Sequence, residues 1–124
     1  MGLDRVVTFP PGRVPGWAAV KEQLARVGES APLRMIEGLP AFPDEVPADG
    51  WTELRVSAGG GMVTVRRAGH ALVCVVWSNA DPALLAARDK VAWACAEAGG
   101  GQVVTDAGSL SPADFARTSH IQPA

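Results

Sequence analysis

The sequence predicts a single α+β domain in which a mostly antiparallel sheet carries two helices on one face. Three observations support this class. The 124 residues have the length of one domain. Two segments with apolar residues at helical spacing lie far apart in the chain, and alternating apolar segments joined by short glycine-containing links lie between them. The predicted order is β-α-β-β-β-β-α-β, with about five or six strands and a short helical turn near the C-terminus.

The first half of the chain contains two predicted strands, one predicted helix and one long loop. Residues 5–9 are rich in β-branched side chains and end at Pro10-Pro11-Gly12, which predicts a strand. Apolar residues recur at helical spacing from Trp17 to Val27, and Gly28 suits a helix end, which predicts a helix over about residues 15–27. Residues 33–37 are predicted as a short strand. Residues 38–50 contain three prolines and three acids, so they predict either a plain connector or a lid or partner-binding loop without regular structure.

The second half begins with three strand-like segments, residues 51–57, 62–67 and 70–77, whose short links predict an antiparallel meander. The last of them is apolar on both faces, which places it centrally and puts Trp77, like Trp17, in the core. Asp81-Pro82 is typical of a helix start, and Gly99–Gly101 ends a predicted helix over residues 82–98. Residues 102–105 close the sheet, and a helical turn starts at Ser111. The domain is predicted to span residues 1–117, with a frayed tail over residues 118–124.

Composition excludes several classes of protein. Hydrophobic residues make up 48% of the chain and the net charge is -2, which argues against a disordered chain and against a strongly basic nucleic-acid binder. No apolar run approaches the length of a bilayer span and no secretory signal is visible, so we expect a cytoplasmic protein without a membrane partner. Arginines far outnumber lysines and alanine is abundant, which suggests a GC-rich bacterial genome as the source.

Motifs that carry catalysis or hold cofactors are missing from the sequence. There is no phosphate-binding Gly-x-x-x-x-Gly-Lys, no dinucleotide-binding Gly-x-Gly-x-x-Gly and no Gly-x-Ser-x-Gly elbow. Cys74 and Cys95 lie in apolar runs and are predicted to be buried thiols. With His70 they make a conceivable zinc set, but no Cys-x-x-Cys or His-x-x-x-His pair supports one. The sequence therefore favours a protein that is not an enzyme, with no cofactor and no metal.

One tryptophan is anomalous on the predicted second helix. At about 100° per residue, an apolar arc formed by Leu84, Ala87, Val91, Cys95 and Ala98 faces the sheet, and Trp93 lies almost opposite it, near Lys90. Three interpretations stay open. Trp93 is covered by the segment from Leu110 to Phe115 or by the loop of Phe42, it lies exposed on the Lys90 stem without a role, or it anchors an interface.

The leading functional hypothesis is a small, non-catalytic protein-binding or self-associating module, with a homodimer or another protein as the partner. The candidate interaction residues are Trp93, Trp51, Lys90 and Phe42, because tryptophan is enriched at binding hot spots and Trp51 is predicted on the Glu53 and Arg55 face of its strand. The alternative is a small-molecule-binding domain or minor enzyme with a pocket under the 38–50 loop. In that case Trp51 would share the pocket with His70, Arg66 and Asp44.

Overall fold

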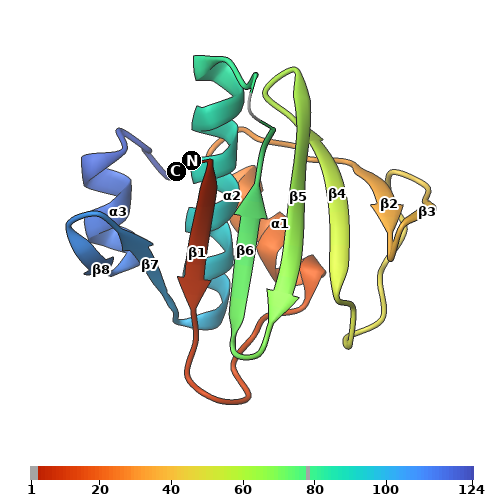
Figure 1. The fold of residues 1–124 in the computed structure, drawn as a ribbon, viewed down its shortest axis with the longest axis horizontal. Coiled ribbons are helices and arrows are strands. Elements are labelled where there is room, and N and C mark those ends of the chain that lie inside the picture. Colours follow the sequence, from red (N-terminus) through yellow and green to blue (C-terminus); the bar gives the residue numbers. More distant parts are fainter. Residues whose placement is uncertain (1–2, 78) are drawn as a thin grey trace.

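The fold is built on one antiparallel sheet, described here from a computed structural model that covers residues 3–77 and 79–124. Among these residues the sheet has eight strands in the order β3-β2-β4-β5-β6-β1-β7-β8 (Figure 1). The strands are β1 (Asp4–Thr8), β2 (Leu33–Ile36), β3 (Leu39–Pro40), β4 (Glu53–Ala58), β5 (Gly61–Ala68), β6 (Ala71–Val75), β7 (Gln102–Thr105) and β8 (Gly108–Leu110). The helices are α1 (Trp17–Ala25), α2 (Pro82–Gly99) and α3 (Pro112–Thr118).

The predicted α+β class is confirmed, and the detail differs from the prediction. The described residues form eight strands and three helices, where the sequence predicted about five or six strands and two helices with a turn. The additional strands β3 and β8 have two and three residues, too few for alternation to reveal them. Each is the second arm of a tight hairpin, with β2 and with β7.

The central part of the sheet follows the predicted meander. β4 pairs with β5 and β5 with β6, both antiparallel. β1 then inserts beside β6, where Val6 lies opposite Val73, and it separates β6 from β7. β6 is therefore a central strand, as its apolar composition predicts.

Helix α2 begins and ends as its sequence predicts. The Asp81 carboxylate accepts a hydrogen bond from the Leu84 backbone N–H at 2.9 Å, and Pro82 occupies the first turn, where its missing N–H costs nothing. The helix ends at Gly100, whose φ of 66° is the left-handed conformation that favours glycine. This helix anchors the layer that covers one face of the sheet.

The core lies between the sheet and this helical layer. Alternate strand residues, among them Val7, Leu54 and Leu72, point toward α1 and α2 and are buried. In Figure 1, α2 lies behind the sheet between α1 and α3. Because neighbours surround it on several sides, every residue from Val91 to Ala96 is buried.

The C-terminal residues 118–124, which the sequence predicts as a frayed tail, contact this layer in the structure. Thr118 belongs to α3, and Ile121 is buried and donates its backbone N–H to the Ala116 carbonyl at 2.8 Å. The Ala124 backbone N–H donates to the Arg26 carbonyl at 2.8 Å, and Arg26 Nε donates to the Ala124 carbonyl at 3.1 Å. The chain end is therefore fastened to the end of α1.

Candidate interaction site on the open face of the sheet

The open face is the side of the sheet that α1 and α2 leave uncovered, and Figure 1 views the molecule from this side. Along β6, Leu72 and Cys74 point into the core, so Ala71, Val73 and Val75 point the other way and are only partly buried. The side chains that an antiparallel sheet turns to solvent are commonly polar. An apolar column along the central strand is therefore unusual.

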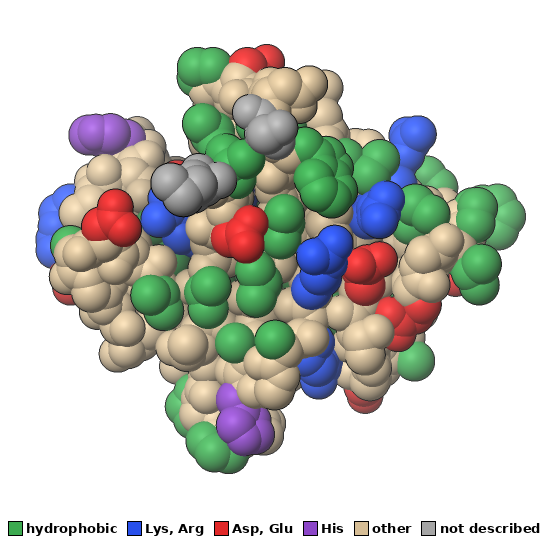
Figure 2. Space-filling view, in the orientation of Figure 1, with side chains coloured by type: hydrophobic (Ala, Val, Ile, Leu, Met, Phe, Trp, Pro, Cys, Tyr) green, Lys and Arg blue, Asp and Glu red, His purple; other side chains and the backbone are tan. Residues whose placement is uncertain are grey.

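The apolar column extends sideways across neighbouring strands. Val6 on β1 lies opposite Val73 on β6 and opposite Val104 on β7, which makes a row of three valines across three strands. Figure 2 shows hydrophobic side chains spread over this part of the face. We call the set the open-face patch, and its members are Val6, Ala71, Val73, Val75, Trp77 and Val104.

Trp77 is the largest side chain of the open-face patch. Its predecessor Val76 is buried, whereas Trp77 is 53% exposed and continues the outward side of β6. A hollow of about 280 Å³ lies at this end of the sheet, lined in part by Trp77, Met62 and the turn from Gly59 to Gly61. The placement of Trp77 in the core was wrong, because an apolar strand is buried on both faces only when both faces are covered.

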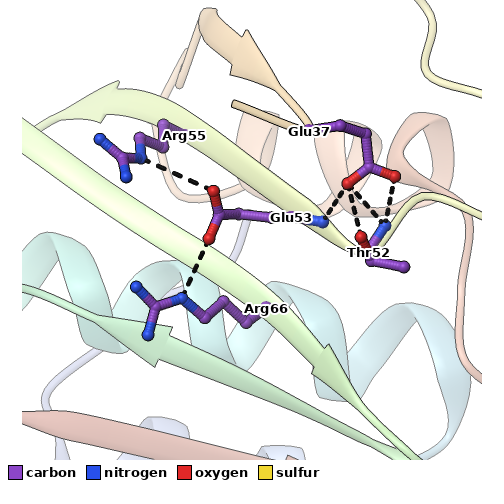
Figure 3. A network of polar contacts seen from close by, with 5 residues as sticks. All are labelled: Glu37, Thr52, Glu53, Arg55 and Arg66. Atoms are coloured by element: carbon purple, nitrogen blue, oxygen red, sulfur yellow. Dashed lines mark hydrogen bonds and ion pairs between the residues drawn. The ribbon is translucent and has the colours of Figure 1, made fainter. Parts of the chain in front are cut away.

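Charged side chains border the open-face patch on the β4–β5 side. Figure 3 shows the Glu53 carboxylate between two guanidinium groups, with Arg66 Nε at 3.1 Å and Arg55 Nε at 3.9 Å. Asp4 stands on β1, on the opposite side of β6. The face thus has an apolar centre with charges of both signs around it, which is the anatomy of many protein interfaces.

Glu37 holds the first residues of β4 in place beside this border. Its carboxylate accepts hydrogen bonds from Thr52 Oγ1 at 2.6 Å, from the Thr52 N–H at 3.0 Å and from the Glu53 N–H at 2.8 Å (Figure 3). The Thr52 hydroxyl has the largest effect in lowering the pKa of Glu37 below its ordinary value, because these hydrogen bonds favour the charged form. We assign this network a structural role, since the carboxylate already accepts hydrogen bonds from two backbone N–H groups and a hydroxyl.

The structure places the sequence-predicted interaction residues differently from the hypothesis. Trp93 is 1% exposed, and the Arg26 guanidinium lies 5.5 Å from the centre of its ring. Trp93 is therefore buried within its own chain, and the residue that lies over its ring is Arg26, which directly follows α1. Lys90 is partly buried.

Trp51 is also buried, against the prediction that it shares the outer face with Glu53 and Arg55. The Arg67 guanidinium lies 5.3 Å from the centre of the Trp51 ring. β4 starts only at Glu53, so the alternation of the strand does not extend back to Trp51. Of the four candidates, Phe42 alone has a large exposed apolar side chain, at 75%.

The residues of the alternative pocket are not brought together. Arg66 lies on the open face, paired with Glu53. His70 is exposed at the turn between β5 and β6. Asp44 lies on the helical side, where it borders a cavity beside α1. A site that combines these three side chains is therefore not formed.

A partly buried ion-pair cluster lies behind β1. The Asp89 carboxylate accepts from Arg5 Nε at 3.1 Å and from Arg88 Nε at 3.1 Å, and Arg5 also lies 5.5 Å from the centre of the Phe115 ring. Arg88 is buried. The cluster connects β1, α2 and α3, and we assign it a structural role.

The two thiols meet in the core. Cys74 of β6 and Cys95 of α2 are both buried, as predicted. A hydrogen bond from one thiol to the other, together with burial, raises the pKa of Cys95. Such thiols are unreactive. In the part of the chain that the structure describes, no group of three or more histidine, cysteine or acidic side chains is arranged to hold a metal ion.

No protein-family model matches the sequence, no curated protein matches it, and no solved structure matches the fold. Over residues 3–77 and 79–124, no helix has both the length and the hydrophobicity needed to cross a membrane. The candidate site therefore rests on its own geometry. Trp77, its most prominent residue, was missed by the sequence reasoning, although the alternation along residues 71–77 contained the signal.

Proposed function

We propose that this chain is a non-catalytic, self-associating module and that two copies pair through their open faces. The observation that carries the proposal is the exposed side chain of Trp77 at one end of the apolar open-face patch. Contiguous exposed apolar patches mark interaction sites, and tryptophan is enriched among the residues that dominate binding energy. Eight strands at about 4.8 Å spacing make a face roughly 34 Å wide, which is broad enough for a sheet-on-sheet contact.

Charge complementarity favours a second copy as the occupant. Charges of both signs border the open-face patch: Asp4 on β1, and Glu53, Arg55 and Arg66 on β4 and β5. Asp4 lies on one side of β6 and the arginines lie on the other. A two-fold axis running along β6 places β1 of one copy over β5 of its partner, and each Asp4 then faces the arginine side of the other copy.

Light scattering coupled to size-exclusion chromatography over a concentration series tests this proposal. We expect a mass near twice 12.8 kDa at high concentration. Trp77→Ser should raise the dimer dissociation constant at least tenfold, which corresponds to about 1.4 kcal/mol. Phe42→Ser is the matched control, because it removes an even more exposed aromatic side chain from another surface, and it should leave the dissociation constant unchanged.

Two outcomes contradict the proposal. A mass of 12.8 kDa at every concentration up to the solubility limit excludes self-association. If Phe42→Ser raises the dimer dissociation constant as much as Trp77→Ser does, the dimer does not form through the open face. Far-UV circular dichroism of both variants shows whether each is folded, and we expect it to be unchanged because both side chains project into solvent.

A further inference from the structure

A second surface, at the far edge of the sheet from β8, carries exposed apolar side chains among acids. We call residues 37–49 the acidic loop. It holds four acids, Glu37, Asp44, Glu45 and Asp49, and no lysine or arginine, whereas the other 111 residues carry nine acids and 11 basic residues. The net negative charge of the chain is therefore concentrated here, and the remainder is net positive.

Three of the large exposed hydrophobic side chains lie on the acidic loop. Leu39 is 69% exposed, Phe42 75% and Val46 76%. Burial of these side chains against a partner would remove apolar surface from water, whereas their exposure in the free chain gains nothing for folding. All three belong to one short segment, so a partner that contacts this segment can bury them together.

The backbone of the acidic loop is ordered, so these side chains are held outward. The Ala41 N–H donates to the Arg34 carbonyl at 3.0 Å, and the Glu45 N–H donates to the Phe42 carbonyl at 3.1 Å. Glu45 Oε1 accepts from the Phe42 N–H at 3.1 Å. Prolines at positions 40, 43 and 47 restrict the chain further. A segment arranged before binding loses less conformational entropy when a partner docks.

A cavity of about 230 Å³ lies between the acidic loop and α1. Among the residues that line it are the apolar Trp17 and Val46 and the acidic Asp44 and Glu45. Lys21 also lines the cavity, so its lining holds two acidic residues and one basic residue. An apolar wall with acids at its border suits a lysine or arginine side chain, whose stem packs on apolar surface while its head meets a carboxylate.

We infer that the acidic loop is a docking site for a basic, apolar segment of a partner protein, with one lysine or arginine side chain of that segment entering the cavity beside Trp17. Charge complementarity selects the partner: the acids attract cationic protein segments, and they repel nucleic acid and anionic lipid. β3, the edge strand on this side, is only two residues long and contains Pro40, so it is poorly suited to pair with a β-strand of the partner. Side chains therefore make the contact. This site is separate from the open face.

Binding of two synthetic peptides of equal length, one of leucine and lysine and one of leucine and glutamate, tests the inference by fluorescence anisotropy. We expect the lysine peptide to bind at least tenfold more tightly, with an affinity that falls as salt is added. Asp44→Asn and Phe42→Ser should each weaken binding several-fold. Asp106→Asn makes the same charge change at the opposite edge of the sheet and should leave binding unchanged, as should Trp77→Ser.

The controls separate a docking site from nonspecific attraction. If Asp106→Asn weakens binding as much as Asp44→Asn, net charge alone attracts the peptide and the inference is wrong. Equal affinity for the two peptides also overturns it. Weakening by Trp77→Ser alone assigns the binding to the open face instead. Dimer formation is measured without peptide. The result for the open face and the result for the acidic loop are therefore independent of each other.

Discussion

The sequence left three interpretations of Trp93 open, and truncation of this side chain tests the burial that the structure gives it. Trp93→Ala removes a side chain that is 1% exposed and lies under the Arg26 guanidinium. Truncation of a buried tryptophan to alanine costs about 3–5 kcal/mol. The unfolding entropy of a 124-residue chain, at about 2.1 cal/mol/K per residue, is roughly 0.26 kcal/mol/K. A loss of about 4 kcal/mol therefore lowers Tm by roughly 15 °C.

Thermal unfolding followed by far-UV circular dichroism measures this effect, with Phe42→Ala as the control. Phe42 is 75% exposed, so its truncation should change stability by no more than about 0.5 kcal/mol, or about 2 °C. A Tm for Trp93→Ala within about 5 °C of the wild type would refute the burial of this residue. It would restore the hypothesis that Trp93 is an exposed interaction anchor.

Three further substitutions test other parts of the fold. Gly59→Ala places a Cβ 2.7 Å from the Ala83 carbonyl oxygen at a φ of +60°. We expect it to lower the free energy of unfolding, measured by urea titration, by about 2–4 kcal/mol. Gly60→Ala is the control, because its Cβ meets open space, and it should cost about 1–2 kcal/mol. Asp89→Asn removes the carboxylate charge shared by two guanidinium groups and should cost about 3 kcal/mol in the same assay. Glu37→Gln should destabilise the protein above pH 4.5, the ordinary pKa of this residue, and the difference from the wild type should vanish as pH falls through the lower pKa of the folded state.

Each of these expectations has an outcome that contradicts it. If Gly59→Ala and Gly60→Ala lower the free energy of unfolding equally, α2 does not approach the β4–β5 turn as closely as the structure shows. A neutral Asp89→Asn would show that the cluster behind β1 contributes nothing to folding. For Glu37, a stability difference that grows as the solution is acidified has the wrong sign for a carboxylate whose charged form is hydrogen-bonded in the folded protein.

Local features of the chain were sufficient to predict most of the framework. Helix α2 begins at the Asp81-Pro82 signal and stops at the glycines after residue 98, because caps act within a few residues of the helix end. The meander of β4, β5 and β6 follows from alternation and short links, which also act locally. These elements could be predicted because the interactions that define them lie close together in the sequence.

The position of β1 and the docking of the C-terminus depend on contacts between distant residues. β1 pairs with β6 and β7, which lie far along the chain, and Ala124 is bonded to Arg26. No local pattern contains either contact. The sequence predicted a frayed tail there because short polar ends fray unless a distant part of the chain holds them.

The candidate site was decided by the tertiary structure for the same reason. The sequence by itself determined that the chain has an unusual number of tryptophans and an apolar central strand. It did not determine which tryptophans are exposed, because hydrophobic patterning shows only which faces are apolar, and burial depends on what packs against each face. Arg26, the residue after the end of α1, lies over Trp93, and none of the described helices covers the outer side of β6. Trp77 is therefore the tryptophan left exposed.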